Sequence, residues 1–408
     1  MSTMSRPIRF RPPRLAISPE VRWMLLRAFG PAGAPFPPPL GGAVALAMAR
    51  RFEVSARIAA RQGRERLAAE LGEEAAAGFA SDRRAAAAVG LRLMGETRRV
   101  AEVAAAVGAP LIFLKFAALE ETGLLAAGSR DACDVDLLAP GGQVRELWHA
   151  LVAAGYRGSG LPESDHQLPA LVWPGGGAVE IHRHLPGVRL EGTASADHEA
   201  LERLGLLCPL PGFPGRCTAP APEVLAAHAL VHGLGQHGWW PASYPLLKMV
   251  ADLLDLGAGE VGAVAALGDR AAAWVERDVS GAEAAAVRRL AGRLAAGEDA
   301  AAFQGPEEIL LRHILAGRLD AEYERALRLG LFLPQPSDRP RPAQLARAVL
   351  GALFLSDAQI AAIYGRPRSR LGYLGRRLVR PFDLLWRLAS YGARWALLKL
   401  PRPRRPSG

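Results

Sequence analysis

Two aspartates separated by one residue are the first side chains in the sequence whose types and spacing suggest chemistry. Asp134 and Asp136 flank Val135 in a short apolar run that continues to Leu138. Because successive strand residues point to opposite faces, the pattern predicts a strand with both carboxylates on one face. Neighbouring carboxylates repel each other and resist burial unless a cation lies between them. Mg²⁺ (or Mn²⁺) suits such oxygen ligands, and a solvated strand end is the alternative interpretation.

A third acidic residue lies in a later predicted strand, Ala178–Leu185. Period-two alternation places Glu180 and His182 on the same face of that strand. The glycines at 175–177 predict a hairpin bend after an earlier strand over Leu168–Trp173. If the strand of the two aspartates is the neighbour of this one, the three carboxylates form a cluster. Such a cluster can hold two metal ions, which stabilise the attacking and leaving oxygens of a phosphoryl transfer.

The wider pattern resembles a known family, the uncharacterised bacterial nucleotidyltransferases of the polymerase-β-like superfamily. In that family a strand ending in Lys-Gly leads to an Arg, then to an Asp-x-Asp pair, and then to Glu-x-His. The matching positions, within residues 95–256, are Lys115, Arg130, Asp134–Leu138, Gly155-Tyr156, His166–Pro169, Glu180–His182 and Asp252-Leu253. The resemblance implies a small mixed β-sheet with flanking helices, Mg²⁺, a nucleoside triphosphate, and transfer of a nucleotidyl group to an acceptor.

The resemblance also implies roles for individual side chains. Asp134, Asp136 and Glu180 would be the catalytic and metal-ligating carboxylates. Glu180 would in addition help to deprotonate the acceptor hydroxyl. Lys115 and Arg130 would bind the nucleotide by neutralising the charge of its triphosphate.

Histidines supply further candidate contacts. His166, in a predicted loop, and His182 are candidate substrate contacts, although an exposed loop histidine is the alternative for His166. His228 and His232 lie one helical turn apart in a predicted helix over 223–237, a spacing that can hold zinc. Because no further ligand is evident from the sequence, we expect these two residues to line the active cleft or to pack in the core.

One position departs from the family pattern. Phe116 follows Lys115 where the family has glycine. A glycine would let the backbone approach the triphosphate closely, and Phe adds a Cβ atom and a ring at that place. Either the phosphates bind slightly differently, or nucleotide binding is weakened or lost. The second outcome would leave a catalytically degenerate binding protein with the same fold.

Composition limits the classes of protein that the chain can form. With 408 residues, 50% of them hydrophobic, the chain is long enough for a substantial core and is not disordered as a whole. The 50 basic residues include three lysines, Lys115, Lys248 and Lys399, and the others are arginines. This preference for arginine, together with the high content of Ala, Gly and Pro, indicates a GC-rich bacterial genome. Three cysteines without metal spacing and the absence of signal-peptide or long apolar segments predict a cytoplasmic protein without a transmembrane helix.

The order of predicted elements indicates an α+β protein, with a small mixed β-sheet of nucleotidyltransferase type embedded in a mostly helical chain. We expect one helix over Ala43–Gln62 and a long helix that Ser81 caps. A Pro/Gly-rich connection is expected over Cys208–Pro222, and an ion pair of structural importance at Asp252, one turn after Lys248. The expected divisions are a loose basic N-terminus (1–17), an N-terminal helical region (18–108), a nucleotidyltransferase-like α/β core (109–190), a helical region (191–364) and a basic amphipathic tail (365–408).

The positive charge of the chain is concentrated in that tail. Residues 365–408 contain twelve Arg or Lys and one acid, Asp383, a net charge of +11. The whole chain has a net charge of +10, so residues 1–364 together carry −1. Apolar residues at helical spacing from Leu371 to Leu400 predict a basic amphipathic helix, which Pro381 would split in two. Such a helix can bind an anionic membrane surface, a polyanion or a partner protein, or pack on its own domain.

These patterns favour a Mg²⁺-dependent nucleotidyltransferase that uses a nucleoside triphosphate and an unknown small-molecule, peptide or protein acceptor. We expect it in the cytoplasm, with peripheral membrane contact as an option for the tail. The degenerate binding protein is the first alternative. A transferase acting on nucleic acid is the second, and the near-neutral body argues against it because a basic track would be expected along the cleft.

Overall fold

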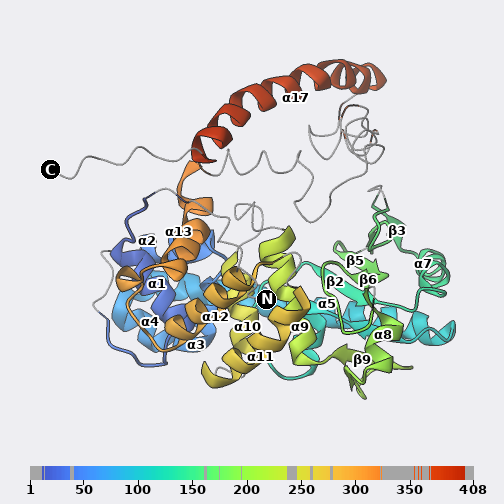
Figure 1. The fold of residues 1–408 in the computed structure, drawn as a ribbon, viewed down its shortest axis with the longest axis horizontal. Helices are drawn as coiled ribbons and strands as arrows, with labels where there is room; N and C mark the ends of the chain where they lie inside the picture. Colours follow the sequence, from blue (N-terminus) through green and yellow to red (C-terminus); the bar gives the residue numbers. More distant parts are fainter. Residues whose placement is uncertain are drawn as a thin grey trace, which may run out of the picture.

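The structure is a computed structural model that describes most of the chain. N-terminal helices, a mixed sheet and further helices follow one another along the sequence, and a long C-terminal helix arches over them (Figure 1). The described residues are 12, 14–36, 41–159, 163–173, 175–193, 195–236, 246–257, 261–275, 279–321, 323, 353, 357, 360, 367 and 369–399.

In the described residues, five helices precede the sheet. They are α1 (Pro19–Phe29), α2 (Gly42–Arg51), α3 (Ser55–Gln62), α4 (Arg64–Leu71) and α5 (Glu73–Ala106). Helix α1 begins where the sequence predicts, because the Ser18 side chain accepts a hydrogen bond from the Val21 backbone amide and Pro19 follows it. Helix α5 contacts α2, α3 and α4 as well as the sheet, so it joins the two parts of the molecule.

Two predictions for this region are wrong. The single helix over Ala43–Gln62 is two helices, α2 and α3, separated near Glu53, whose φ of 56° lies in the left-handed region. Ser81 lies inside α5 instead of capping it, since α5 begins directly after Gly72. The Ala-rich sequence on both sides of Ser81 has high helix propensity, which outweighs the capping preference of a single serine.

The sheet has seven strands in the described residues, in the order β3-β4-β5-β2-β1-β9-β8. They are β1 (Leu111–Phe113), β2 (Asp134–Leu138), β3 (Arg157–Gly158), β4 (Leu171–Val172), β5 (Ala178–His182), β8 (Leu207–Pro209) and β9 (Cys217–Pro220). Strand β2 is parallel to β5, β1 is parallel to β9, and the other pairs are antiparallel. The fold is therefore α+β with a mixed sheet, as predicted.

Comparison with the predicted strands gives one confirmation and two corrections. The hairpin around the glycines at 175–177 is confirmed, because β4 and β5 are antiparallel neighbours. The connection predicted over Cys208–Pro222 is wrong, because β8 and β9 form a hairpin that extends the sheet beyond residue 190. The first strand ends at Phe113, so Lys115 is the first residue of a helix, α6 (Lys115–Glu121), and not part of a strand.

Helices α5, α6 and α7 (Val144–Ala153) lie close to the strands that carry the acidic residues. Helix α5 contacts β2, α6 and α7, and α7 contacts β5. Val135 and Leu137 of β2 are fully buried in the hydrophobic core. Alternation along β2 therefore directs Asp134 and Asp136 to the opposite face of the sheet.

The other helices of the described residues follow β5 in sequence. They are α8 (His198–Arg203), α9 (Pro222–Leu230), a π-helical segment η1 (Val231–Gln236), α10 (Leu246–Leu256), α11 (Val261–Val275), α12 (Gly281–Ala295), a 3₁₀ turn η2 (Ala300–Ala302), α13 (Pro306–Leu319) and α17 (Arg370–Lys399). A two-stranded ribbon of β6 (His184–Leu185) and β7 (Ala196–Asp197) precedes α8. Helix α17 is continuous through Pro381, so the predicted split is wrong. Within the described residues, no helix is long and apolar enough to cross a membrane.

Candidate active site

The register between β2 and β5 brings the predicted acidic residues together. The two strands are parallel, with Asp136 opposite Glu180 and Asp134 opposite Ala178. Leu138 is opposite His182, so His182 follows Glu180 by one repeat on the same face of β5. The predicted neighbourhood of the two strands is therefore confirmed.

Asp136 is the centre of the resulting cluster. Its side chain is almost fully buried, and its Oδ1 atom lies 2.8 Å from Nζ of Lys115 and 3.1 Å from Nε2 of His182. The same Nε2 atom lies 3.9 Å from Oε2 of Glu180. One carboxylate oxygen thus contacts a lysine from the β1–α6 junction and a histidine from β5.

Lys115 reaches this position through an unusual backbone conformation. Its φ is 45°, in the left-handed region that non-glycine residues seldom adopt. The preceding residue, Leu114, donates its backbone N–H to the carbonyl of Asp136, which holds the end of β1 against β2. The chain then turns directly into α6, and the Lys115 side chain meets the Asp136 carboxylate.

The charges of the cluster shift the pKa values of Asp136, Lys115, Asp134 and Glu180. Burial disfavours the carboxylate of Asp136, but the charge of Lys115 and the hydrogen bond of His182 hold the pKa of Asp136 well below its usual range. Burial would lower the pKa of Lys115, but the charges of Asp136 and Asp134 raise it. Repulsion from Asp136, together with burial, raises the pKa of Asp134. Burial, together with the charge of Asp136, raises the pKa of Glu180.

These donors fit a divalent cation. Asp136, Glu180 and His182 each offer one ligand atom, and these three atoms lie within 4.8 Å of one another. Carboxylate oxygens suit Mg²⁺ or Mn²⁺, and an imidazole nitrogen is a further ligand that transition metals accept. A cation here would also relieve the repulsion that raises the pKa of Asp134 and of Glu180. Asp134 lies outside this set of three, so its place as a metal ligand stays a prediction.

Arg130 forms the ion pair that the sequence suggested at Asp252. Its Nε and Nη2 atoms lie 2.7 and 3.0 Å from the two carboxylate oxygens of Asp252, and both side chains are 9% exposed. Lys248, the expected neighbour of Asp252, instead lies 3.2 Å from Oε2 of Glu53. The structural ion pair therefore joins the connection before β2 to helix α10. The contact of Arg130 with a triphosphate stays a prediction.

The Phe116 ring is part of the hydrophobic core. The residue is 5% exposed, and a Cβ atom built at Gly90 of α5 would lie 3.1 Å from its Cζ atom. Gly90 therefore leaves the room that the ring occupies between α6 and α5. The ring therefore takes part in core packing, and the effect of Phe116 on nucleotide binding stays a prediction.

His166 lies beside the cluster, as the loop position suggested. Its ring stacks on that of His182, with centroids 6.0 Å apart and planes at 17°. Burial and the neighbouring His182 and His184 lower the pKa of His166 to about 4. His166 is therefore placed as a neutral ring at the edge of the site, and its contact with substrate stays a prediction.

A small cavity of about 20 Å³ adjoins the cluster. Its lining residues are Lys115, Leu119, Arg130, Leu225, His228, Ala229, His232, Asp252 and Leu256. His228 and His232 stack with centroids 5.8 Å apart, and neither ring nitrogen of His228 has a hydrogen-bond partner. Burial, with the charges of Lys115 and His182, lowers the pKa of His228 to about 3. In the part of the chain that the structure describes, no third ligand joins this pair, so the expectation that it lines the site is favoured over zinc.

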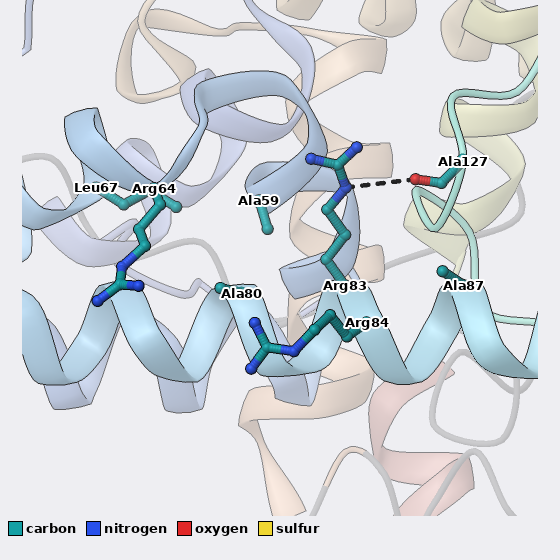
Figure 2. A pocket seen from close by; sticks show the side chains of 8 residues that line it. All are labelled: Ala59, Arg64, Leu67, Ala80, Arg83, Arg84, Ala87 and Ala127. Atoms are coloured by element: carbon teal, nitrogen blue, oxygen red, sulfur yellow. Dashed lines mark hydrogen bonds between the residues drawn. The ribbon is translucent and has the colours of Figure 1, made fainter.

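A second cavity, of about 410 Å³, lies between α3, α4, α5 and the connection that leads into β2. Its lining residues are Ala59, Arg64, Leu67, Ala80, Arg83, Arg84, Ala87 and Ala127. Figure 2 shows three arginine side chains above and beside the alanines of α5, with Nε of Arg83 donating to the Ala127 carbonyl at 3.4 Å. Neither Asp136 nor Glu180 lines this cavity, so it is separate from the acidic cluster.

The mixed sheet, its flanking helices and the acidic cluster on β2 and β5 define an α+β protein of nucleotidyltransferase type. The model of the uncharacterised nucleotidyltransferase family matches residues 43–257. The chain therefore belongs to that family. No curated protein and no solved structure matches the chain.

Proposed function

We propose that this protein is a divalent-metal-dependent nucleotidyltransferase that moves a nucleotidyl group from a nucleoside triphosphate to the hydroxyl of an acceptor. The observation that supports this most strongly is the register of β2 and β5, which sets Asp136 opposite Glu180 and directs His182 to the same carboxylate. Membership of a nucleotidyltransferase family gives this cluster a chemical context.

The side chains divide the work of the reaction among them. Asp136, Glu180 and His182 would hold the divalent cation, which when bound neutralises phosphate charge and favours ionisation of the acceptor hydroxyl. Lys115 borders both the cluster and the small cavity, so its ammonium group can donate to a phosphate oxygen. Asp134, next along the same face of β2, would add a second carboxylate toward the metal.

Glu180 is the candidate base. Its raised pKa means that its carboxylate can accept the proton of the acceptor hydroxyl as that oxygen attacks. The attacking oxygen forms a bond to the α-phosphorus, the bond from that phosphorus to the bridging oxygen breaks, and pyrophosphate leaves with the electron pair. The transition state gathers charge on the phosphoryl oxygens, and the Lys115 ammonium group would stabilise that charge.

The experiment is a labelling reaction with cell extract as the source of acceptor. Each nucleoside triphosphate is supplied with label on either the α- or the γ-phosphate, together with Mg²⁺ or Mn²⁺. We expect label from the α-position alone to enter a product. Transfer of γ-label would indicate phosphoryl transfer instead, and no labelled product with any triphosphate would favour the degenerate binding protein.

A pair of variants makes this experiment specific to the cluster. Glu180→Gln should abolish labelling because it removes both a ligand and the candidate base. Glu146→Gln changes an exposed glutamate in the first turn of α7 and should label as the parent does. Equal labelling by both variants would contradict the role of Glu180.

A further inference from the structure

Helix α17 exposes its large apolar side chains. An outer stripe, with at least half of each side chain exposed, consists of Leu371, Leu374, Leu378, Val379, Phe382, Leu385 and Trp386. At 100° per residue, these seven positions fall within a sector of about 140° on one side of the helix. Isolated surface apolar residues need no explanation, but a contiguous patch of this kind marks an interaction surface.

The opposite side of α17 contains its buried residues. Arg380 and Leu384 are buried there, and Nη2 of Arg377 lies 2.8 Å from a carboxylate oxygen of Asp357. A terminal helix that packed on its own domain through its apolar stripe would show the reverse arrangement. Within the described residues, the outer stripe therefore faces away from the body, and Figure 1 shows α17 arching over it.

The charge of the helix restricts what can cover the stripe. Residues 370–399 contain seven Arg or Lys and one acid, Asp383, a net charge of +6. A nucleic acid would match this charge but would leave the apolar side chains in water. A second copy of the helix could cover the stripe but would bring two segments of +6 together.

A bilayer that contains anionic lipids satisfies both features at once. Its acyl chains accept the apolar side chains, and its headgroups attract arginine and lysine. Trp386, 73% exposed at the margin of the stripe, suits the boundary between these two layers because its ring is amphipathic. A helix of 30 residues is about 45 Å long, which gives an extended contact parallel to the membrane plane.

We propose that α17 binds the surface of anionic membranes, with the outer stripe inserted among the acyl chains and exposed basic residues beside it, such as Arg376, at the headgroups. The contact attaches the nucleotidyltransferase-type domain to the membrane without a spanning segment. It does not depend on the enzymatic activity, since the helix and the acidic cluster share no residue.

Co-sedimentation of the full-length protein with vesicles tests this inference. Phosphatidylcholine vesicles with phosphatidylglycerol should bind the protein in a salt-sensitive manner, and vesicles of phosphatidylcholine alone should bind it far less. Leu378→Glu/Phe382→Glu should reduce binding on the order of tenfold or more, since two inserted side chains are lost. Leu91→Glu is the matched control, because Leu91 is 78% exposed on α5, and it should bind as the parent does.

Three outcomes would overturn the proposal. The first is that the parent does not bind anionic vesicles, and the second is that the Leu91→Glu control loses as much binding as the stripe variant. The third is that the parent forms a dimer and does not bind vesicles, and that the stripe variant is a monomer. The last would assign the stripe to self-association. Because Leu378 and Phe382 are exposed, the stripe variant should melt at the temperature of the parent, and that measurement separates lost binding from lost folding.

Discussion

At the scale of single residues, Lys115 and Asp136 form the contact on which the candidate site depends. Both were predicted from the sequence as site residues, because a D-x-D pair after a lysine matches the family pattern. Their direct ion pair could not be predicted, since it arises from the left-handed backbone at Lys115 and from the register of two strands. His182 was predicted as a substrate contact. Its hydrogen bond to Asp136 depends on the register of β2 and β5, which the sequence does not show.

Removing either charge of this pair should reveal their coupling. Asp136→Asn leaves Lys115 in a largely buried place without its closest counter-charge, and we expect a loss of about 3–5 kcal/mol in the free energy of unfolding. Lys115→Met should cost a similar amount, and the double variant less than the sum. Urea unfolding of the four proteins measures this, and strictly additive losses would show that the two side chains do not interact.

Phe116 illustrates how a substitution in a motif can belong to packing. Because its ring fills space beside Gly90, Phe116→Gly should lower the free energy of unfolding by about 3–5 kcal/mol without strengthening nucleotide binding. A melting curve and nucleotide calorimetry on the same samples check both parts. Gly90→Ala should be less favourable in the parent than beside Phe116→Leu, because the new methyl group would lie 3.1 Å from the Phe116 ring. Tighter nucleotide binding by Phe116→Gly would contradict this expectation and would indicate that the Phe116 side chain hinders nucleotide binding.

At the scale of elements, the sequence predicted most reliably the parts whose partners are close along the chain. The β4–β5 hairpin follows from its glycines, and α1 follows from Ser18 and Pro19. Strand β9, Cys217–Pro220, was missed because it is short, ends in proline and exists through pairing with β1, about a hundred residues away. Arg130 was not predicted as the partner of Asp252, because these two residues also lie more than a hundred positions apart along the chain.

Helix α4 is held to α1 by an ionic group whose behaviour with pH can be predicted. Glu70 accepts hydrogen bonds from the side chains of Trp23, Arg27 and Arg66. Burial disfavours its charge, but the hydrogen bonds from Arg66, Trp23 and Arg27 lower the pKa of Glu70 below its usual range. A carboxyl group with a lowered pKa in the folded state stabilises the fold above its unfolded pKa. That contribution is lost as pH falls through the folded pKa.

Urea unfolding between neutral and acidic pH tests this linkage. Glu70→Gln should be less stable than the parent at pH 7, and the difference should shrink as the pH falls below about 4.5. Glu65→Gln, an exposed position on the same helix, should show little difference at any pH. A Glu70→Gln deficit that persists unchanged in acid would mean that the lost contribution is not ionic.

At the scale of the whole molecule, two parts of different character share one chain. The family match begins at residue 43, so it takes in residues of α2 to α5 as well as the sheet, whereas the motif pattern reached only to residue 95. Those helices carry no chemical motif, and their role is visible only in the packing of α5 against β2, α6 and α7. The net positive charge lies outside the matched residues, in residues 365–408, where α17 presents its outer stripe.

Calorimetric titration with Mn²⁺ tests most directly whether the acidic cluster is the metal centre of a nucleotidyltransferase. The full-length parent and Glu146→Gln should bind Mn²⁺ with the same affinity, since Glu146 lies outside the cluster. Asp136→Asn and Glu180→Gln should each bind about tenfold more weakly or worse, because each removes a ligand from a set of three. Equal affinity in all four proteins, or no binding by the parent, would contradict the assignment of Asp136, Glu180 and His182 as the metal site.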